Sequence, residues 1–252
     1  MQIITSDYIP VRPFFAETLL LAIGQRYDVI INANQSAGSY WFRASVADDC
    51  LSLNKRNALA IWTYSGVKRR TPKSSSYKFP SSCVEPSSLV PYWVQTVPSS
   101  DFASSLRELD VTITGQRITP NGSAIFVWAL GNSSLNLDWE YPTLSYLMDG
   151  NTSYPDALNV IPTVTEGRWN FWLVQQPAGL APIPHPIHLH GHDVFVLGQG
   201  SGSFDVNTAE LNFATAPRRD TASVQAGGWL ALAFNSNNPG KLLVRRVLFK
   251  QG

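Results

Sequence analysis

The chain has 252 residues, of which 44% are hydrophobic and 12% aromatic, and its formal net charge is +1 at pH 7. This length and apolar content suffice for one or two domains with buried cores, which excludes an intrinsically disordered protein. Acidic and basic residues are intermixed, so no basic face indicates binding to nucleic acid or to an anionic membrane surface. No apolar run approaches the roughly eighteen residues that span a bilayer.

Short segments with alternating apolar and polar residues, or with a strand-rich composition, recur along the chain. They predict β-strands at Thr18–Ile23, Tyr27–Ile31, Ser39–Ala44, Asn57–Tyr64, Leu109–Thr114, Ala124–Leu130, Trp169–Gln175, Val194–Leu197 and Trp229–Phe234. Most of these segments are bounded by Gly, Pro, Asn or Ser, which form turns and end strands. Long amphipathic helical patterns are nearly absent. The predicted fold class is therefore all-β, as an antiparallel β-sandwich.

From about Ser65 to Ser105 the strand pattern weakens into a stretch rich in Ser, Pro and Lys. We predict that this stretch forms a surface connection between two domains. The basic run from Lys68 to Arg70 is expected to be a solvated loop, with an interaction patch as the alternative. Because so long a linker is uncommon in a compact protein, we expect it to lie against the domain surfaces.

Two cysteines, Cys50 and Cys83, lie on either side of part of this connection. Only one intramolecular pairing is possible, and it would stabilise the fold by about 3–4 kcal/mol in the chain-entropy model. Two free thiols in a reducing compartment are the alternative. Four N-x-S/T sequons favour a glycosylated, secreted protein, and they lie at Asn34, Asn121, Asn132 and Asn151.

All four histidines fall between His185 and His192, in the run HPIHLHGH. Imidazole is the commonest metal-ligating side chain, and it suits copper, zinc, iron and nickel. In an extended strand His188, His190 and His192 would share one face and converge on one metal centre or a close group of centres. A proline on each side of His185 holds it in a stiff extended segment, so it is expected to point elsewhere. The window therefore predicts a metal site.

These histidines have three alternative interpretations. A lone histidine is more often a satisfied core or surface residue than a ligand. A structural zinc site with cysteine ligands does not fit, because Cys50 and Cys83 lie far upstream and lack C-x-x-C spacing. A cupin-like iron or manganese site would use His188 and His190 as its H-x-H pair. It normally adds a glutamate a few residues later, and residues 191–198 contain none.

The stretch HPIHLHGHDVFVLGQG resembles the third copper-ligand motif of the multicopper oxidases, and specifically of fungal laccases. The segments SDYIPVRPF and GQRYDVIINANQSAGSYWFRA are similar to the second cupredoxin domain of laccases of the ascomycete type. The segments LNLDWEYPTLSYLMDGNTSYPDALNV, GRWNFWLVQ and PRRDTASVQAGGW are similar to the third domain. The resemblance covers nearly the whole chain, up to about Gly240.

This resemblance implies two cupredoxin-like Greek-key domains. Residues 1–66 are expected to be part of the second laccase domain, incomplete at its N-terminus, and residues 67–105 to be the linker. Residues 106–252 are expected to be the third domain, without its C-terminal ligand segment. Related laccases carry a disulfide in the place corresponding to Cys50 and Cys83, so we expect this bridge. Laccases are secreted, whereas residues 1–7 have none of the features of a signal peptide.

Matched position by position, His185 would bind the blue copper, His188 the single normal copper of the trinuclear cluster and His190 one of its paired coppers. His192 is not expected to bind copper directly, and Asp193 or a backbone group is expected to orient it. The family holds four copper ions, oxidises phenolic substrates by one-electron steps and reduces dioxygen to water. The blue copper also needs a cysteine thiolate, and neither Cys50 nor Cys83 is placed for it.

Three ligands do not assemble a four-copper site. We therefore expect the isolated chain to bind copper weakly or not at all, and to show neither a blue absorption band nor turnover. We also expect the first domain to be missing, and residues 241–252 to be translated intron or an error in the gene structure, because a Gly-Lys pair can be encoded by GGTAAG. The alternative is a non-catalytic copper-binding or interacting fragment, which would associate through the unpaired strand edges that incomplete sheets expose.

Overall fold

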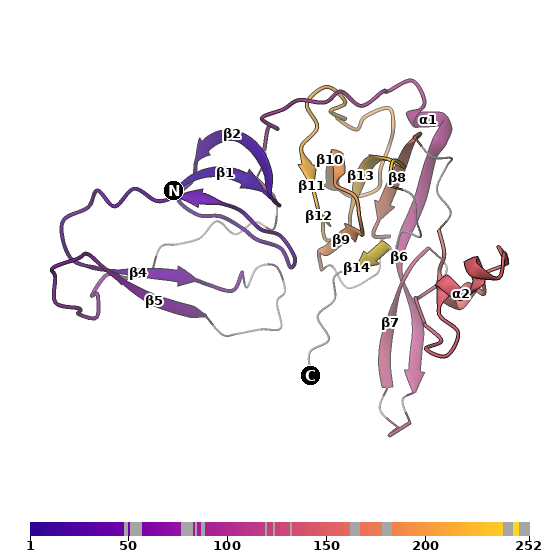
Figure 1. Cartoon of the computed structure of the whole chain (residues 1–252), viewed down its shortest axis with the longest axis horizontal. Coiled ribbons are helices and arrows are strands. Elements are labelled where there is room, and N and C mark those ends of the chain that lie inside the picture. Colours follow the sequence, from indigo (N-terminus) through magenta and orange to yellow (C-terminus); the bar gives the residue numbers. More distant parts are fainter. Residues whose placement is uncertain are drawn as a thin grey trace.

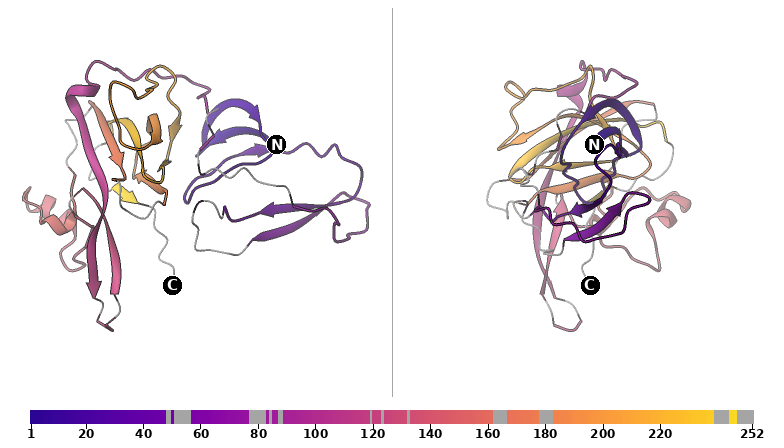
Figure 2. Two further views of the ribbon diagram at one scale, coloured as in Figure 1. Left: turned by 180° about the vertical axis from the view of Figure 1, so that it is seen from behind. Right: turned by 90° about the vertical axis from the view of Figure 1, so that its left-hand side faces the viewer.

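The computed structural model describes residues 1–47, 50, 57–76, 83, 85–86, 89–118, 120–122, 124–131, 133–161, 167–177, 183–238 and 244–246. Strands dominate these residues and form two lobes, an N-terminal lobe with β1–β5 and a C-terminal lobe with β6–β14 (Figure 1). The view from behind shows the same division (Figure 2, left). The helices are short: α1 is Phe102–Ser105, α2 is Thr143–Met148 and η2 is the 3₁₀ turn Asp156–Leu158. The predicted all-β class is confirmed.

The C-terminal lobe is built on a six-stranded sheet in the order β11-β10-β13-β8-β6-β7. Its strands are β6 (Leu106–Ile118), β7 (Ala124–Leu130), β8 (Trp169–Gln175), β10 (Val194–Ser201), β11 (Arg218–Arg219) and β13 (Gly228–Asn235). Neighbouring strands run antiparallel except β6 and β8, which pair in parallel. The sheet is therefore mixed, whereas the sequence predicted a purely antiparallel one. The chain crosses over between β7 and β8, so that β8 pairs with β6 in parallel.

A smaller sheet in the order β12-β9-β14 carries the histidine window. Its strands are β9 (His185–Leu189), β12 (Thr221–Val224) and β14 (Val244–Arg246). The apolar side chains of β9 and β12 share one buried cluster with alternate residues of the large sheet, such as Trp172 and Val174 of β8 and Leu232 and Phe234 of β13. The two sheets thus enclose a single core, and that core fixes the position of β9.

The central strands of the large sheet are buried on both faces. Along β8, Trp172 and Val174 face the small sheet, whereas Phe171 and Leu173 belong to a second cluster on the opposite face. Loop residues complete that second cluster, and the ring of Phe102 lies edge-on to the ring of Phe171 with a centroid distance of 5.6 Å. Because successive side chains of a strand point to opposite faces, a strand covered on both sides has an almost continuous apolar sequence. This explains why the run WNFWLV predicted its strand so clearly.

The N-terminal lobe has a smaller core. Its strands are β1 (Gln2–Ser6), β2 (Ile9–Phe15), β3 (Val29–Ile30), β4 (Ser39–Ala44) and β5 (Ala58–Thr63). A sheet in the order β2-β1-β3 buries Ile3 and Val11 together with Leu89 from the connecting segment. The separate β4–β5 hairpin leaves large apolar side chains exposed, including Phe42, Leu59 and Trp62.

The connecting segment touches both lobes. The backbone N–H of Arg12 in β2 donates to the carbonyl of Val90 at 2.8 Å, and the N–H of Tyr92 donates to the carbonyl of Pro10 at 2.9 Å. Further on, the N–H of Val97 donates to the carbonyl of Phe213 in the C-terminal lobe at 2.8 Å. The described part of this segment therefore lies against both lobes, and it buries Leu89 and Val97 there.

A buried charge cluster also joins the lobes. The guanidinium of Arg219, whose side chain is 1% exposed, lies 3.3 Å from a carboxylate oxygen of Asp7 and 3.3 Å from one of Glu85, and it stacks over the ring of Tyr27. Burial raises the pKa of Glu85 and outweighs the lowering effect of Arg219. Burial alone would lower the pKa of Arg219, but the charges of Glu85, Tyr27 and Asp7 and the hydrogen bond with Tyr27 together outweigh it and raise the pKa.

Several observed strands differ from the predicted ones. The structure forms no strand at Thr18–Ile23, where the prediction was wrong: Leu19 packs against the small N-terminal core from an irregular segment. The predicted strands also omit β1, β2, β9, β11, β12 and β14, whose prolines and polar residues obscure an alternating pattern, although the window that contains β9 was expected to be extended. Strands centred on Phe42, Trp172 and Leu232 were predicted within a few residues of their bounds.

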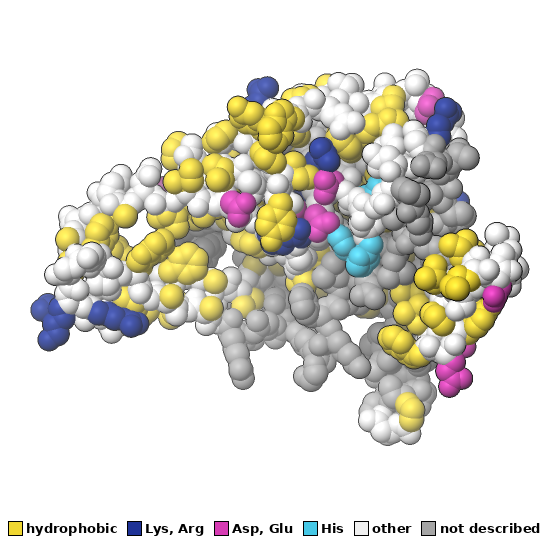
Figure 3. Space-filling view, viewed as in Figure 1, with side chains coloured by type: hydrophobic (Ala, Val, Ile, Leu, Met, Phe, Trp, Pro, Cys, Tyr) yellow, Lys and Arg dark blue, Asp and Glu magenta, His cyan; other side chains and the backbone are white. Residues whose placement is uncertain are grey.

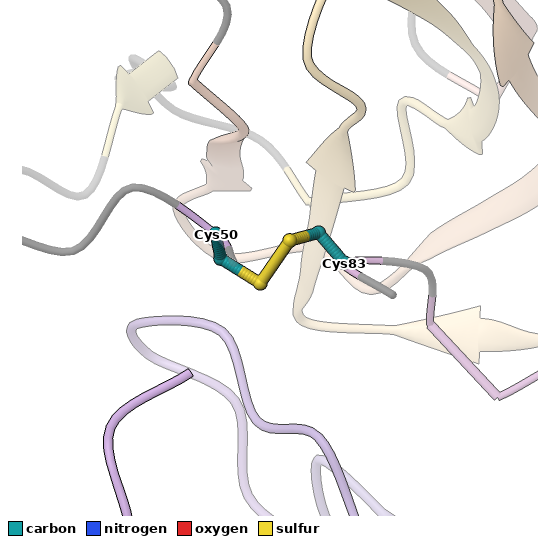
Figure 4. Close-up of a disulfide and its surroundings, with 2 residues drawn as sticks. All are labelled: Cys50 and Cys83. Carbon is teal, nitrogen blue, oxygen red and sulfur yellow. A yellow bond between two sulfur atoms is a disulfide. The ribbon is translucent and has the colours of Figure 1, made fainter. Parts of the chain in front are cut away.

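The two cysteines form the expected disulfide. Cys50 and Cys83 are joined with a Cα–Cα distance of 5.4 Å, within the range usual for such bridges (Figure 4). The bridge closes a loop of 33 residues in sequence, so the free-thiol alternative is wrong for this structure. Within the described ranges, no helix combines the length and apolar character needed to cross a membrane.

Candidate metal centre

The histidine window begins as a strand and ends as a turn. β9 pairs with β12 so that His188 lies opposite Thr221 and His185 opposite Val224. The strand ends at Leu189, and Gly191 adopts a positive φ of 76°. Glycine tolerates this conformation because it has no Cβ. The chain therefore turns away from the strand direction directly after the first histidines.

His188 and His190 lie side by side. Their ring centroids are 4.7 Å apart, with the ring planes at 68°. Figure 3 shows histidine side chains at the surface between the two lobes, next to acidic and basic side chains. The two imidazoles are thus close enough to act at one metal centre or at two neighbouring centres.

The ring of His188 is held through one nitrogen. Its Nδ1 lies 2.7 Å from the backbone carbonyl oxygen of Asp220 and 3.1 Å from the Oδ1 of the same residue. Both partners are acceptors, so Nδ1 donates the hydrogen bond, and a ring with its single proton on Nδ1 has its lone pair on Nε2. A metal-bound histidine usually has this arrangement, in which the second nitrogen donates to a carbonyl or carboxylate oxygen.

His192 does not join this pair, which corrects the expectation that three alternate histidines share one strand face. The turn at Gly191 places His192 in the core, 8% exposed, with its ring 5.5 Å from that of Phe234. Neither ring nitrogen has a hydrogen-bond partner among the described residues. The expectation was wrong because side chains alternate regularly between two faces only within a strand, and this strand ends at Leu189.

Asp193 was expected to orient His192, and the structure places it elsewhere. Its carboxylate lies 3.0 Å from the guanidinium of Arg218, on the neighbouring strand β11. The pair is partly exposed, so it contributes little to stability. The sequence neighbours His192 and Asp193 thus face different partners.

His185 lies apart from the other histidines, as predicted. It is fully buried at the start of β9, and its ring packs edge-on against Trp128 of β7 with a centroid distance of 4.7 Å. Its Nε2 lies 3.2 Å from Nε2 of Gln176. The side-chain amide oxygen of Gln176, Oε1, accepts a hydrogen bond from the backbone N–H of Gly227 at 2.5 Å, so the backbone holds this side-chain amide in place.

The donor set fits part of a copper site. Imidazole nitrogens of His185, His188 and His190 are suitable copper ligands. A blue copper also needs a thiolate, and Cys50 and Cys83 are both consumed in the disulfide. Among the described residues, no group of three or more His, Cys, Asp and Glu side chains is arranged to hold a metal ion. The imidazoles of His185, His188 and His190 are therefore suited to copper by their chemistry, although the described residues form no group of three or more ligands.

Comparison of the whole chain with known families distinguishes copper from the other metals that imidazole binds. Two sequence profiles of known families match this chain, and both are described as multicopper oxidase. One matches residues 1–67, and the other matches residues 130–245, which include all four histidines. The chain belongs to the multicopper oxidase family.

The relatives of this multicopper oxidase chain include fungal laccases. Laccase-3 of Botryotinia fuckeliana is 40% identical over 253 residues, which cover 96% of this chain and 55% of the relative. Laccase-1 of Melanocarpus albomyces is 36% identical over 259 residues, covering 96% of this chain and 41% of the relative. The crystal structure of laccase from Botrytis aclada matches with a TM-score of 0.84 and 35% identity, covering 97% of this chain and 44% of that one. This multicopper oxidase chain therefore spans about half the length of the curated relatives it matches.

Three residues beside the histidines of this multicopper oxidase chain were not singled out from the sequence. Asp220 holds His188, Gln176 faces His185, and Trp128 covers the ring of His185. Asp220 lies within the segment PRRDTASVQAGGW that carried part of the resemblance, so the motif itself was a usable signal. Trp128 lies within β7 and Gln176 just beyond the end of β8, neither in a distinctive pattern, and only the tertiary packing brings them to His185.

Proposed function

We propose that this chain supplies part of the copper-binding core of a laccase, with His185, His188 and His190 as ligands. The observation that carries the proposal is the neighbouring pair His188 and His190, in which Nδ1 of His188 is held by Asp220 and Nε2 is left free. Copper, when bound, would supply the one-electron oxidation of phenolic substrates and the reduction of dioxygen to water. The fungal laccases among the relatives support this assignment.

The protein side chains have distinct proposed roles. His188 and His190 present neighbouring nitrogens to the trinuclear cluster, and Asp220 keeps His188 in the tautomer that can bind. His185 is proposed as a ligand of the blue copper. Its buried position against Trp128 excludes water from one side of the ring.

We further propose that the chain by itself is not a complete enzyme. It contributes three of the imidazoles that four copper ions need, and its two thiols form a bridge. A non-catalytic copper-binding or interacting fragment is the second candidate. It is favoured by the exposed apolar side chains of the β4–β5 hairpin, where Phe42, Leu59 and Trp62 are each more than half exposed. Such a hairpin would associate with another polypeptide through its edges and its apolar face.

Copper titration of the purified chain tests the ligand assignment. We expect fewer than four copper ions per chain and no blue absorption band. His188→Ala and His190→Ala should each weaken cupric ion binding by about tenfold or more, since each removes a ligand. His192→Gln is the matched control within the same window and should bind as the wild type does. Equal binding by the His188→Ala, His190→Ala double variant and the wild type would contradict the assignment, and turnover of a phenol by the isolated chain would show that the site is complete.

Secretion and glycosylation remain proposals as well, together with the domain boundaries at residues 1–66, 67–105 and 106–252. The side chains of Asn34, Asn121 and Asn151 are exposed, as glycan acceptors must be, and Asn132 lies outside the described residues. The disulfide favours an oxidising compartment. Expression through a fungal secretory pathway, followed by mass spectrometry before and after enzymatic deglycosylation, would identify the modified asparagines.

A further inference from the structure

Asp220 connects His188 to the other lobe. Its Oδ2 accepts from Nη1 of Arg26 at 2.7 Å, while its Oδ1 and backbone carbonyl oxygen both face Nδ1 of His188. Both carboxylate oxygens are thus engaged, one on each side. Arg26 belongs to the N-terminal lobe, where Nη1 also donates to the carbonyl of Gly24 at 2.6 Å. The guanidinium is therefore anchored in its own lobe while it holds Asp220.

Asp7 strengthens this connection. The backbone N–H of Asp7 donates to the carbonyl of Arg26 at 2.7 Å, and the N–H of Arg26 donates to Oδ1 of Asp7 at 2.8 Å. Oδ2 of Asp7 accepts from the N–H of Asp220 at 3.2 Å and from the N–H of Thr221 at 3.1 Å. Asp220 is consequently held at its backbone by Asp7 and at its carboxylate by Arg26, and these two residues are bound to each other.

The N-terminal lobe and the connecting segment make further contacts with β12. Nε2 of Gln25 donates to the carbonyl of Thr221 at 3.1 Å, and the N–H of Ser223 donates to Oε1 of Glu85 at 3.0 Å. The opposite edge of β12 pairs with β9, in which Thr221 lies opposite His188. β12 therefore lies between the N-terminal lobe and the strand that carries the proposed ligands.

We propose that Arg26 is a positioning residue for His188, acting through Asp220, so that the N-terminal lobe sets the orientation of a copper ligand in the C-terminal lobe. The metal-ligand role of His188 rests on the proposed function, whereas the coupling between Arg26 and the His188 ring rests on the contacts alone. Turning the ring by 180° would replace the Nδ1 contacts with Asp220 by a C–H group. The ion pair with Arg26 keeps Asp220 in place and so opposes that turn. Loss of such a partner behind a ligand typically weakens metal binding about 10- to 100-fold.

The four histidines of the chain make a direct experiment possible, since selective ¹⁵N labelling of histidine gives only four imidazole patterns. Long-range ¹H–¹⁵N spectra distinguish a ring protonated at Nδ1 from one protonated at Nε2. In the metal-free wild-type chain we expect His188 to show a single form with the proton on Nδ1. In Arg26→Gln we expect the His188 pattern to move toward an average of the two forms. Cupric ion affinity, measured by titration calorimetry with a copper salt, should fall about tenfold in the same variant.

Arg218→Gln is the matched control. Arg218 pairs with Asp193 at 3.0 Å, and its side chain is 34% exposed against 36% for Arg26, but it does not contact Asp220 in the described structure. This control should leave the His188 pattern and the copper affinity at their wild-type values. Asp220→Asn keeps the backbone carbonyl and removes the ion pair, so it provides a second variant with the same expected change if Arg26→Gln does not fold.

The possible outcomes separate the two proposals. An unchanged His188 pattern in both Arg26→Gln and Asp220→Asn would overturn the positioning role. Equal changes in the ¹H–¹⁵N patterns of all four histidines would also overturn it, because they would indicate a general loss of structure. A His188-specific change together with weakened copper binding supports it. If the wild type binds no copper while His188 still responds to Arg26→Gln, the coupling stands and the proposed copper function fails.

Discussion

Asp7→Asn tests whether the buried charge cluster holds the two lobes together. The carboxylate of Asp7 is completely buried and pairs with Arg219 at 3.3 Å. It also accepts three backbone N–H groups, from Arg26, Asp220 and Thr221. Asparagine has the same shape and tolerates the positive φ of 51° at this position. The substitution therefore changes the charge and one oxygen and leaves the backbone conformation possible.

The expected cost follows from these partners. One of the two amide positions of asparagine is an NH₂ group, which would face either the N–H of Arg26 or the N–H groups of Asp220 and Thr221. Arg219 would keep only Glu85 as a buried carboxylate partner. Removing one partner of a buried ion pair typically costs about 3–5 kcal/mol. Since whole domains are stable by roughly 5–15 kcal/mol, this loss should be obvious in any equilibrium measurement.

Urea unfolding followed by tryptophan fluorescence measures the effect, because the chain has eight tryptophans. Asp28→Asn is the matched control: Asp28 is exposed and accepts a single hydroxyl hydrogen bond, from Thr5 at 2.7 Å. It should cost no more than about 1 kcal/mol. If the free energies of unfolding of the two variants differed by less than about 1 kcal/mol, the buried cluster would not stabilise the contact between the lobes as argued.

Three further variants test other parts of the fold. Burial raises the pKa of Glu85 above its ordinary 4.5, so the stability it contributes is present below that pH and is lost as the pH rises through the raised value. The free energy of unfolding of the wild type, measured relative to that of Glu85→Gln, should therefore fall by up to about 1.4 kcal/mol for each unit of rising pH. Urea unfolding over a range of pH measures this difference, and a difference that stays constant with pH would contradict the argument. A Cβ on Gly228 would lie 2.1 Å from the carbonyl oxygen of Gly200, whereas one on Gly38 meets nothing closer than 3.5 Å. Gly228→Ala should therefore lower the free energy of unfolding by about 1–3 kcal/mol or more, whereas Gly38→Ala should change it little. Thermal melts compare the two variants, and a melting temperature of Gly38→Ala at or below that of Gly228→Ala would contradict the reasoning. Cys50→Ser opens the loop of 33 residues and should lower the free energy of unfolding by about 4 kcal/mol. The reduced wild type should unfold with the same free energy as this variant, and a clear difference between them would show that the bridge is not the cause.

Much of the fold could be predicted from residue patterns because its central strands have strong local signals. β8 and β13 are buried on both faces, so nearly every residue in them is apolar and the strand is recognisable without its neighbours. β9 contains a proline and two histidines, and its partner β12 is only four residues long, so neither has a recognisable pattern. Their strand form depends on pairing with each other and on the shared core beneath them.

The sequence by itself determined the family, the all-β class and the identity of the proposed ligands, because a concentrated run of histidines among matching flanks is a local property of the chain. Only the tertiary structure decided that His192 leaves the group, that Asp193 pairs with Arg218, and that Asp220 and Arg26 stand behind His188. Arg26 and His188 are separated by 162 positions, and their connection through Asp220 exists only because β12 packs between the two lobes. A contact of this kind depends on where whole strands lie, and no local pattern of residue types encodes that.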